Sequence, residues 1–289
     1  MSMHILVCIK QVPDSAQIRV HPVTNTIMRQ GVPAIVNPYD LYALEEALRL
    51  KDRYRGRITV LSMGPPQTEV ALRKALAFGA DEAILLTDRA FAGADTLATS
   101  YALAAAIKQV HEKLPVDLVF AGKQTIDGDT AQVGPGIATR LGMQLLTYVS
   151  RIESLDLDAR EITVHRRAEG GVQVIKTRLP SLVTVLEGVN DMRFATLTDM
   201  FRAARHPLTI WNKEDAQIED ITKIGLKGSP TAVSKVFAPK PTDRRAEIIE
   251  TQSGQPADLA ATLVGKLFAQ HSDLALSISS SSVSSARQS

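Results

Sequence analysis

One turn of the sequence combines the residue types that a nucleotide site needs: Ala121-Gly-Lys-Gln-Thr-Ile-Asp-Gly-Asp-Thr-Ala-Gln-Val-Gly-Pro-Gly136. The apolar run 116–120 precedes this turn and a helical pattern follows it, an order that is typical of phosphate binding in α/β folds. Backbone N–H groups at the start of a helix lack partners and lie at the positive end of the helix dipole. A phosphate can therefore be held here without a cationic side chain, and Gly128 and Gly134 would let the backbone approach it closely.

A simpler interpretation of the turn is that Asp127, Asp129 and Thr130 only cap the helix that follows. We find no catalytic motif elsewhere in the sequence. The single cysteine, Cys8, cannot form a disulfide, a cluster ligand set or a multi-cysteine zinc site within this chain, and its apolar strand favours a core residue over a reactive thiol. The six histidines are His4, His21, His111, His165, His206 and His271. They show neither the spacing of metal ligands nor a neighbouring nucleophile signature, so no motif supports a hydrolase or a metalloenzyme.

The composition is that of an ordinary globular protein, with 289 residues, 45% of them hydrophobic and 22% charged. The net charge of +2 is close to balance and the basic residues form no long run with interleaved aromatics, which argues against nucleic-acid binding. The longest apolar stretches are of strand length and the N-terminus leads straight into a strand. We therefore expect no signal peptide, no membrane-spanning helix and a cytoplasmic location.

Short apolar runs alternate with helical patterns, which predicts an α/β fold with a doubly wound, mainly parallel sheet, Rossmann-like and of the adenine-nucleotide-binding type. The first helix is expected to begin after Asn37, a good N-cap, and to end at Gly56. Further helices are expected over 70–78 and, after the N-cap Asp95, over about 96–112. The apolar runs are 5–9, 58–63, 83–86, 116–120 and 182–186.

From Ser150 onward the pattern changes to short strands that are joined by turns. The segments 151–155, 161–167 and 172–178 alternate as strands do, and Glu169-Gly-Gly171 is a typical hairpin turn. We therefore expect an antiparallel hairpin at the edge of the sheet.

The last quarter of the chain has a different character. The segment 211–257 contains several prolines and little periodicity, which favours an extended arm that lies on a partner. An amphipathic helix is expected over 259–268, and the serine-rich segment 277–289 is expected to be disordered. The predicted division is an α/β nucleotide-binding domain (1–206), an extended C-terminal arm with its helix (207–276) and the tail.

Four blocks of sequence resemble the β subunit of electron transfer flavoproteins, and the resemblance extends from the first strand to at least Phe268. They are Val7-Cys-Ile-Lys-Gln-Val-Pro-Asp14, Asn37-Pro-Tyr-Asp-Leu-Tyr-Ala-Leu-Glu-Glu-Ala-Leu-Arg-Leu-Lys51, Met63-Gly-Pro-Pro66 and Val164-His-Arg-Arg-Ala-Glu-Gly-Gly-Val-Gln-Val-Ile-Lys-Thr-Arg-Leu-Pro-Ser-Leu-Val-Thr184. Together they are far more specific than a lone glycine motif.

The resemblance implies a heterodimer with an α subunit, which the C-terminal arm would contact, and electron exchange with a flavin dehydrogenase of the acyl-CoA type. In this family the β subunit holds either AMP or, in bifurcating members, a second FAD. The run Asp127-Gly-Asp-Thr-Ala-Gln-Val-Gly-Pro135 resembles the bifurcating branch, and so does the end that contains residues 228–239. Gly128 and Pro135 would leave room for a diphosphate and its flavin. NADH would then be the electron donor, and ferredoxin or flavodoxin the low-potential acceptor.

Individual residues are carried over from this resemblance. Cys8, Asn37, Asp40 and Met63 match positions that line the adenosine end of the family's pocket. The phosphate turn is matched by Gln124, Thr125, Asp127, Gly128, Asp129, Thr130, Ala131, Gln132, Val133 and Gly134. Simpler roles remain open, because Asn37 could only cap its helix, Met63 could only fill the core and Gln132 could only bond the loop to itself.

The block Asn190-Asp-Met-Arg-Phe-Ala-Thr-Leu-Thr-Asp-Met200 resembles the loop through which the family docks its dehydrogenase. Its anchor falls on Leu197, and Arg193, Phe194 and Met200 would accompany it. An exposed apolar residue on a loop is a plausible interface hot spot. The alternative is that Leu197 and Met200 begin a helix over 196–204 and pack inward.

The sequence thus predicts an electron-carrying β subunit in which FAD does the redox chemistry and no side chain acts as a nucleophile. A non-bifurcating β subunit that holds structural AMP is the nearer alternative. An ATP-binding stress-type domain or nucleotide hydrolase of similar architecture is the more distant one, because fold alone does not give function.

Overall fold

A computed structural model of the protein describes residues 3–14, 19–20, 27–28, 33–231, 246–250 and 254–271. The chain divides into two compact units, Met1–Ala238 and Pro239–Ser289. The first unit contains a large sheet with helices, and the described part of the second contains the helix α6 (Pro256–Gln270). The predicted disordered tail 277–289 lies outside the described residues.

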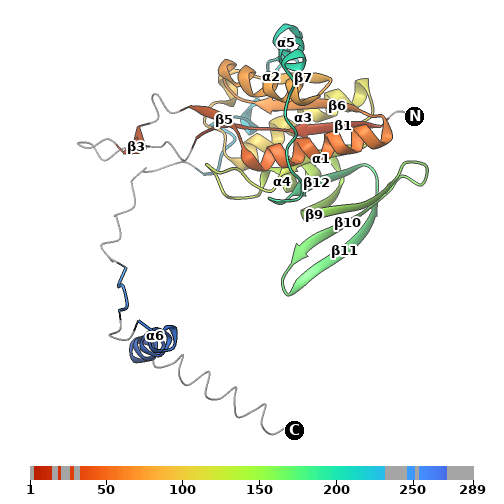
Figure 1. The fold of residues 1–289 in the computed structure, drawn as a ribbon. Helices are drawn as coiled ribbons and strands as arrows, with labels where there is room; N and C mark the ends of the chain where they lie inside the picture. The colour runs from red at the N-terminus through yellow and green to blue at the C-terminus, as the bar shows by residue number, and fades with distance from the viewer. Residues whose placement is uncertain are drawn as a thin grey trace. The chain divides into compact units, whose positions relative to one another are not determined.

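Among the described residues, nine strands form one sheet in the order β11-β10-β9-β12-β8-β1-β6-β7-β13. Neighbouring strands from β9 to β13 are parallel, and β10 is antiparallel to both β9 and β11 (Figure 1). The predicted fold class is confirmed. The strands are β1 (His4–Cys8), β6 (Arg57–Met63), β7 (Glu82–Leu86), β8 (Leu118–Gly122), β9 (Gln144–Asp156), β10 (Glu161–Ala168), β11 (Gly171–Arg178), β12 (Ser181–Val185) and β13 (Thr209–Trp211).

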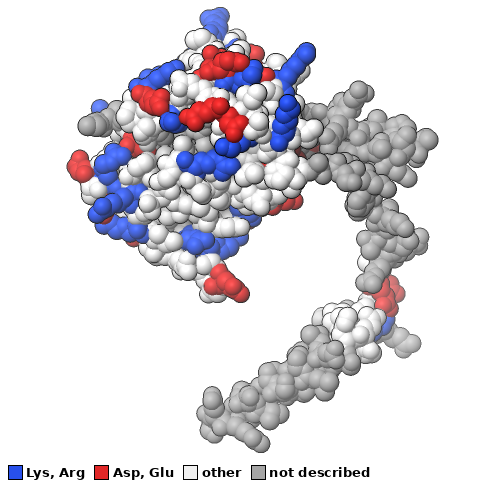
Figure 2. All heavy atoms as spheres, turned by 180° about the vertical axis from the view of Figure 1, so that it is seen from behind, with Lys and Arg blue, Asp and Glu red and all other residues white. Residues whose placement is uncertain are grey.

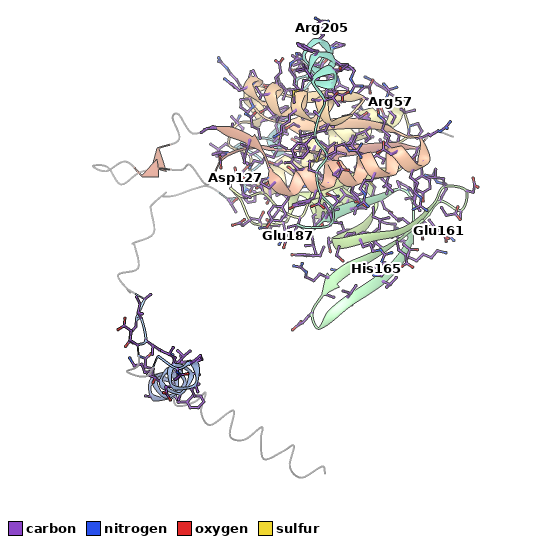
Figure 3. The ribbon with its side chains drawn as sticks, viewed as in Figure 1. Arg57, Asp127, Glu161, His165, Glu187 and Arg205 are labelled. Atoms are coloured by element: carbon purple, nitrogen blue, oxygen red, sulfur yellow. The ribbon has the colours of Figure 1, made fainter. Side chains whose placement is uncertain are left out.

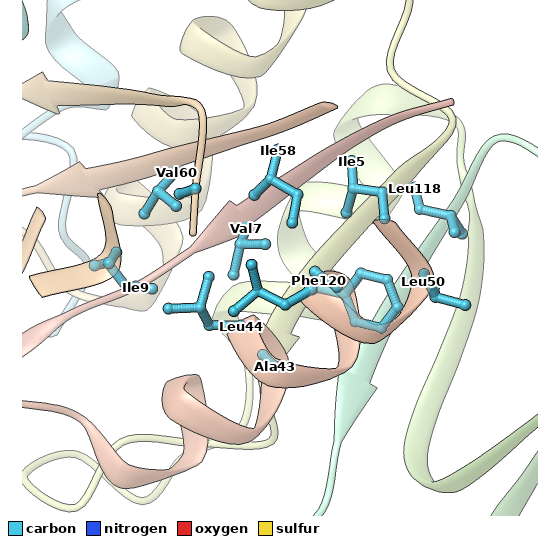
Figure 4. Close-up of a cluster of buried hydrophobic side chains, with 14 of the residues drawn as sticks. Ile5, Val7, Ile9, Ala43, Leu44, Leu50, Ile58, Val60, Leu118 and Phe120 are labelled. Atoms are coloured by element: carbon cyan, nitrogen blue, oxygen red, sulfur yellow. The ribbon is translucent and has the colours of Figure 1, made fainter. Parts of the chain in front are cut away.

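Helices cover both faces of the sheet because its central strands are apolar on both sides. Alternate residues of β1 point to opposite faces, with Ile5 and Val7 in one buried cluster and Leu6 and Cys8 in another. The first cluster includes side chains of α1 and α2 and is drawn in Figure 4; the second includes side chains of α3 and α4. The helices of this unit are α1 (Pro38–Tyr54), α2 (Glu69–Phe78), α3 (Thr96–Lys113), α4 (Val133–Leu141) and α5 (Leu197–Arg205), with single 3₁₀ turns η2 (Pro66–Thr68), η3 (Arg89–Phe91) and η4 (Ile221–Lys223).

Two small two-stranded ribbons accompany the main sheet. The ribbons pair β2 (Gln11–Pro13) with β5 (Ala34–Val36) and β3 (Arg19–Val20) with β4 (Ile27–Met28).

The Asp95 carboxylate accepts the N–H groups of Leu97 and Ala98 and so caps α3 as expected. Thr196 and Asp199 form a reciprocal capping box that starts α5 at Leu197, close to the predicted boundary.

The first strand of the antiparallel edge is longer than the sequence pattern indicated, because β9 begins at Gln144 and pairs first in parallel with β12 and then antiparallel with β10. Between the two halves of β9, Tyr148 has a φ of 55°, and the register with β12 shifts there. A left-handed residue at a bulge bends the strand. The alternating pattern alone did not show this bend, because a bulge interrupts the period of two.

The first part of the predicted arm belongs to the α/β unit. β13 adds a parallel strand beside β7, and Trp211, Ala216 and Ile224 are buried in the core cluster that includes α3 and α4. Short, irregularly spaced apolar residues of this kind show no helical or strand period, which is why the segment resembled an extended arm. The described residues up to 231 thus lie in the unit Met1–Ala238, whereas the sequence pattern placed the end of the nucleotide-binding domain at 206.

Two glycines let α4 lie unusually close to its neighbours. A Cβ atom on Gly134 would lie 2.7 Å from Cγ2 of Thr184 in β12, and one on Gly136 would lie 2.7 Å from Oγ of Ser100 in α3. The backbone approach that we expected at Gly134 is thus an approach to the sheet.

We predict that Gly134→Ala lowers the free energy of unfolding by about 1–3 kcal/mol, because the added methyl group overpacks the contact between α4 and β12. Chemical denaturation of both proteins measures this difference. Gly265→Ala in α6 is the matched control, since a Cβ atom there would meet no heavy atom within 4 Å and alanine favours a helix. A Gly134→Ala variant as stable as this control would contradict the packing argument.

Candidate nucleotide site

The described part of the first unit has a large cavity at the point where the strand order reverses. The chain passes from β1 to β6 and β7 on one side and then returns to β8 on the other side of β1. Loops at the carboxyl ends of such strands diverge and leave a crevice for a ligand. The cavity has a volume of about 990 Å³ and is lined from the ends of β1, β6, β7 and β8 and from the starts of α3 and α4. Figure 3 shows Asp127 at this end of the sheet and Glu161 and His165 on the antiparallel strands.

Most of the predicted binding residues line this one cavity, and three do not. The lining residues among them are Cys8, Asp40, Met63, Gln124, Thr125, Gly128, Thr130, Ala131, Gln132, Val133 and Gly134. Asn37, Asp127 and Asp129 do not line it. These three have contacts that shape the turn.

Asp40 joins the ends of β1 and β8 at the reversal point. Its buried carboxylate accepts the backbone N–H of Lys10 at 2.7 Å and that of Gly122 at 3.1 Å. A side chain at position 122 is excluded because its Cβ atom would lie 2.6 Å from the Asp40 carboxylate and the same distance from Tyr39. Burial raises the pKa of Asp40 to about 7, although the two backbone donors and Asn37 oppose this shift.

Asn37 fastens the phosphate turn and does not cap α1 with its side chain. The fully buried amide donates to the carbonyl oxygen of Gln124 at 2.9 Å, and its own oxygen accepts the N–H of Ile126 at 3.2 Å. No side-chain bond reaches the first N–H groups of α1. The capping interpretation of Asn37 is wrong, because both ends of its amide already bind the turn.

Charged residues hold the outer side of the turn. The Lys10 ammonium lies 2.8 Å from the Asp127 carboxylate and so links the end of β1 to the turn. Burial acts to raise the pKa of Asp127. Hydrogen bonds from Lys10 and Thr125 outweigh burial and keep this pKa below its usual value. The Gln124 amide donates to Asp129 at 3.0 Å. Neither carboxylate caps α4, so the capping interpretation of this turn is also wrong.

The start of α4 is open toward the cavity. Its N-cap residue, Gln132, makes no side-chain bond to the first turn of the helix, and its side-chain oxygen instead accepts the hydroxyl of Thr96 at 2.9 Å. Gln132 thus bonds to α3 and not to its own loop. Gln132, Val133 and Gly134 all line the cavity. Uncapped N–H groups at the positive end of a helix dipole suit a phosphate.

The other walls of the cavity are mainly apolar. Cys8 and Met63 both line it, and burial together with the Asp40 charge raises the pKa of the Cys8 thiol to about 12. The thiol is therefore neutral and serves as a small wall residue. Three cationic residues, Lys10, Arg89 and Lys123, line the cavity together with three aspartates, Asp40, Asp88 and Asp95, so its charged lining is mixed.

Sequence reasoning missed one wall, the loop 87–96 that follows β7. A usable signal was present, because Asp88 comes two residues after a predicted parallel strand and Asp95 directly before a predicted helix. Loops at that edge line the crevice of a doubly wound sheet. Asp88 accepts the backbone N–H of Ala90, and its carboxylate lies 3.4 Å from the Lys213 ammonium.

The predicted docking residues separate into one structural residue and an exposed group. Arg193 donates to Glu45 at 2.9 and 3.0 Å and lies 2.9 Å from Asp52, so it anchors the segment to α1. Phe194 is 96% exposed, Leu197 69% and Met200 51%. The alternative, in which Leu197 and Met200 begin a helix and pack inward, holds only for the helix, because α5 begins at Leu197 but both side chains are exposed.

Other features of the described residues are plain. No group of three or more histidine, cysteine, aspartate or glutamate side chains in this part of the chain could hold a metal ion. No helix in the described ranges has the length and apolarity to span a bilayer. On the face that Figure 2 shows, basic and acidic side chains are interspersed over the first unit.

The protein is thus an α/β protein with a mainly parallel sheet and a cavity at the carboxyl edge of that sheet, the place where open α/β sheets bind their ligands. A family model described as electron transfer flavoprotein domain matches residues 24–216. The chain is 67% identical to protein FixA of Azotobacter vinelandii over 94% of its own length and 97% of that protein's. It is 47% identical to the electron transfer flavoprotein subunit beta of Clostridium acetobutylicum over 93% and 99% of the two lengths.

The chain belongs to the electron transfer flavoprotein family. Its correspondence over nearly the full length of β subunits places it with that subunit. Membership implies a role in electron transfer and a flavin or nucleotide ligand.

Asp40 gives the pH dependence of stability a predictable sign. Its native pKa of about 7 exceeds the ordinary value of 3.8, so between these values the native state holds a proton that the unfolded state has lost. The free energy of unfolding should therefore fall as the pH rises from about 4 to about 7 and lose this dependence above that range.

Asp40→Asn should remove this component of the slope, which amounts to at most about 4 kcal/mol. Urea denaturation of the two proteins at a series of pH values measures the difference. Parallel curves would show that Asp40 titrates normally and would contradict its assignment as a desolvated carboxyl group.

Proposed function

We propose that this protein is the β subunit of a heterodimeric electron transfer flavoprotein, and that its cavity binds FAD. The α subunit, a flavin dehydrogenase of the acyl-CoA type, NADH and a ferredoxin or flavodoxin would be its partners in a bifurcating electron transfer. The proposal rests on the family membership together with the shape and chemistry of the cavity.

The observation that carries the FAD assignment is the cavity itself. At about 990 Å³ it lies at the upper end of the range for small-molecule sites, and a dinucleotide has more than twice the atoms of AMP. Gly128 lines this space, and a Cβ atom there would lie 3.0 Å from Oγ1 of Thr125. This contact accounts for glycine at position 128 by the geometry of the turn itself, so the room for a second group on the diphosphate rests on the cavity volume.

The residues of this chain would have distinct roles toward such a ligand. The first turn of α4, from Gln132 to Gly134, would hold the diphosphate through backbone N–H groups. Cys8 and Met63 would form the apolar wall beside the adenosine, and Asp40 would keep that wall in register with β8. The bound FAD would supply the redox chemistry, and the protein would position it and exclude water.

The alternative is a non-bifurcating subunit that holds AMP in part of the same cavity. It shares the phosphate turn, so the turn alone does not separate the two ligands. The third possibility, an ATP-binding stress-type domain, finds no support in the comparisons, which all point to electron transfer flavoproteins.

We predict that the heterodimer, co-expressed with its α subunit, contains two FAD molecules and no AMP, and that NADH reduces it directly. Extraction and chromatography of the cofactors, followed by anaerobic titration with NADH, test both points. Reduction of ferredoxin or flavodoxin should also require the dehydrogenase and its high-potential acceptor at the same time. One FAD together with AMP, and no reduction by NADH, would contradict the bifurcating assignment.

We also propose that the exposed group at the start of α5 docks the dehydrogenase. Truncation of an interface anchor typically costs about 2 kcal/mol, or roughly thirtyfold in affinity. Leu197→Ala should therefore weaken electron transfer to the dehydrogenase to this extent and leave the FAD content unchanged. Val70→Ala on α2 is a matched control, since Val70 is 65% exposed. Equal transfer rates in the two variants would show that Leu197 is not part of the interface.

A further inference from the structure

The wall of the cavity that follows β7 is held in place from behind by the C-terminal segment of the α/β unit. Most residues of the loop 87–96 line the cavity, whereas no residue of the segment 209–231 does. The Lys213 ammonium lies 3.4 Å from Asp88, and the backbone N–H of Leu226 donates to the carbonyl of Ala92 at 3.1 Å. The two segments therefore form a double layer, with the loop on the ligand side.

The contact between these layers requires glycine at one position. Gly225 has a φ of 57°, and a Cβ atom there would lie 2.1 Å from the carbonyl oxygen of Ala90. Ile224, next to it, is buried in the core cluster. The segment is thus seated specifically on the loop.

Asp95 is the point where the two layers are bonded most densely. One carboxylate oxygen accepts the first N–H groups of α3, and the other accepts the hydroxyl of Thr231 at 2.8 Å and its backbone N–H at 3.2 Å. The backbone N–H of Asp95 donates to the hydroxyl of Ser229 at 2.8 Å. Both hydroxyls lie outside the cavity, and both fix the residue that starts α3.

The next residue carries this constraint to the phosphate turn. Thr96 follows Asp95 directly, lines the cavity and donates its hydroxyl to Gln132 at 2.9 Å. Gln132 is the N-cap of α4, where the phosphate would lie. The hydrogen bonds of Thr231 to Asp95 and of Thr96 to Gln132, joined by the peptide bond between Asp95 and Thr96, therefore link Thr231 to the start of α4.

We infer that Asp95 is a positioning residue of the nucleotide site, and that the hydroxyl groups of Ser229 and Thr231 set nucleotide affinity from outside the cavity. This inference rests on the proposed nucleotide-binding function. Thr231 lies shortly before Pro239, the first residue of the second unit. Because coupling between sites is reciprocal, a bound nucleotide should in turn stabilise the segment that leads to that unit.

The test compares three variants of the full chain in its heterodimer with the α subunit. Thr231→Val removes the hydroxyl at nearly constant shape, Thr231→Ser keeps it, and Thr222→Val removes a hydroxyl of the same segment that bonds only to Asp220. After removal of the bound cofactor, titration with FAD and separately with AMP gives the dissociation constants. We expect Thr231→Val to raise the constant about two- to tenfold, the range for one hydrogen bond, and the other two variants to match the wild type.

Hydrogen–deuterium exchange of the same proteins provides a readout that a merely structural role would not change. Saturating ligand should slow amide exchange over 224–231 in the wild type and much less in Thr231→Val, although these residues do not touch the cavity. Equal affinities of Thr231→Val and Thr222→Val, or exchange that the ligand leaves unchanged, would overturn this inference alone. Failure of the wild type to bind either nucleotide would overturn the proposed function together with it.

Discussion

A buried carboxylate at the start of α1 holds together the two strand ends between which the cavity lies. Asp40 accepts one backbone N–H from β1's continuation and one from the end of β8, and these strands are where the sheet reverses its order. Desolvation raises the pKa of Asp40 to about 7 even though these two donors stabilise the charged form. Asn37, one turn earlier, fixes the phosphate turn by a pair of hydrogen bonds. The first turn of a single helix thus sets the geometry of the whole site.

The same region shows how packing and binding share residues. Gly134 lines the cavity with its backbone and lets α4 lie against β12, and Gly122 lets the end of β8 lie against α1. A glycine in such a place serves the fold first, because a Cβ atom would meet a neighbour whether or not a ligand is present. The shape of the cavity therefore depends on close contacts within the chain itself.

The sequence predicted the sheet and its helices because these depend on local patterns, and it drew attention to a turn that lines the cavity. Apolar runs of strand length, N-caps such as Asp95 and the turn 121–136 each leave a readable signal. The sequence pattern did not predict the structure of segments that pack only through contacts with distant parts of the chain. Trp211, Ala216 and Ile224 follow no period and are buried only because β7 and α3 offer them a surface.

Individual side-chain roles were also beyond sequence reasoning. Asn37 has the residue type of a helix cap, and its amide instead binds a turn that lies 87 residues further along the chain. The aspartates of that turn likewise suit a cap, and Asp127 is paired with Lys10. Residue type limits what a side chain can bond, but the fold decides which partner comes within reach. The family resemblance singled out the turn, most of which lines the cavity, and did not assign these partners.

The central claim is that the nucleotide of this flavoprotein lies between the ends of β1 and β8 with its phosphates at the start of α4. A crystal or cryo-electron microscopy structure of the purified heterodimer tests it most directly. The account predicts density for a dinucleotide in this cavity, with diphosphate oxygens within hydrogen-bonding distance of the backbone N–H groups of Val133 and Gly134. A cavity filled by side chains of the α subunit, or a nucleotide bound elsewhere on the chain, would contradict it.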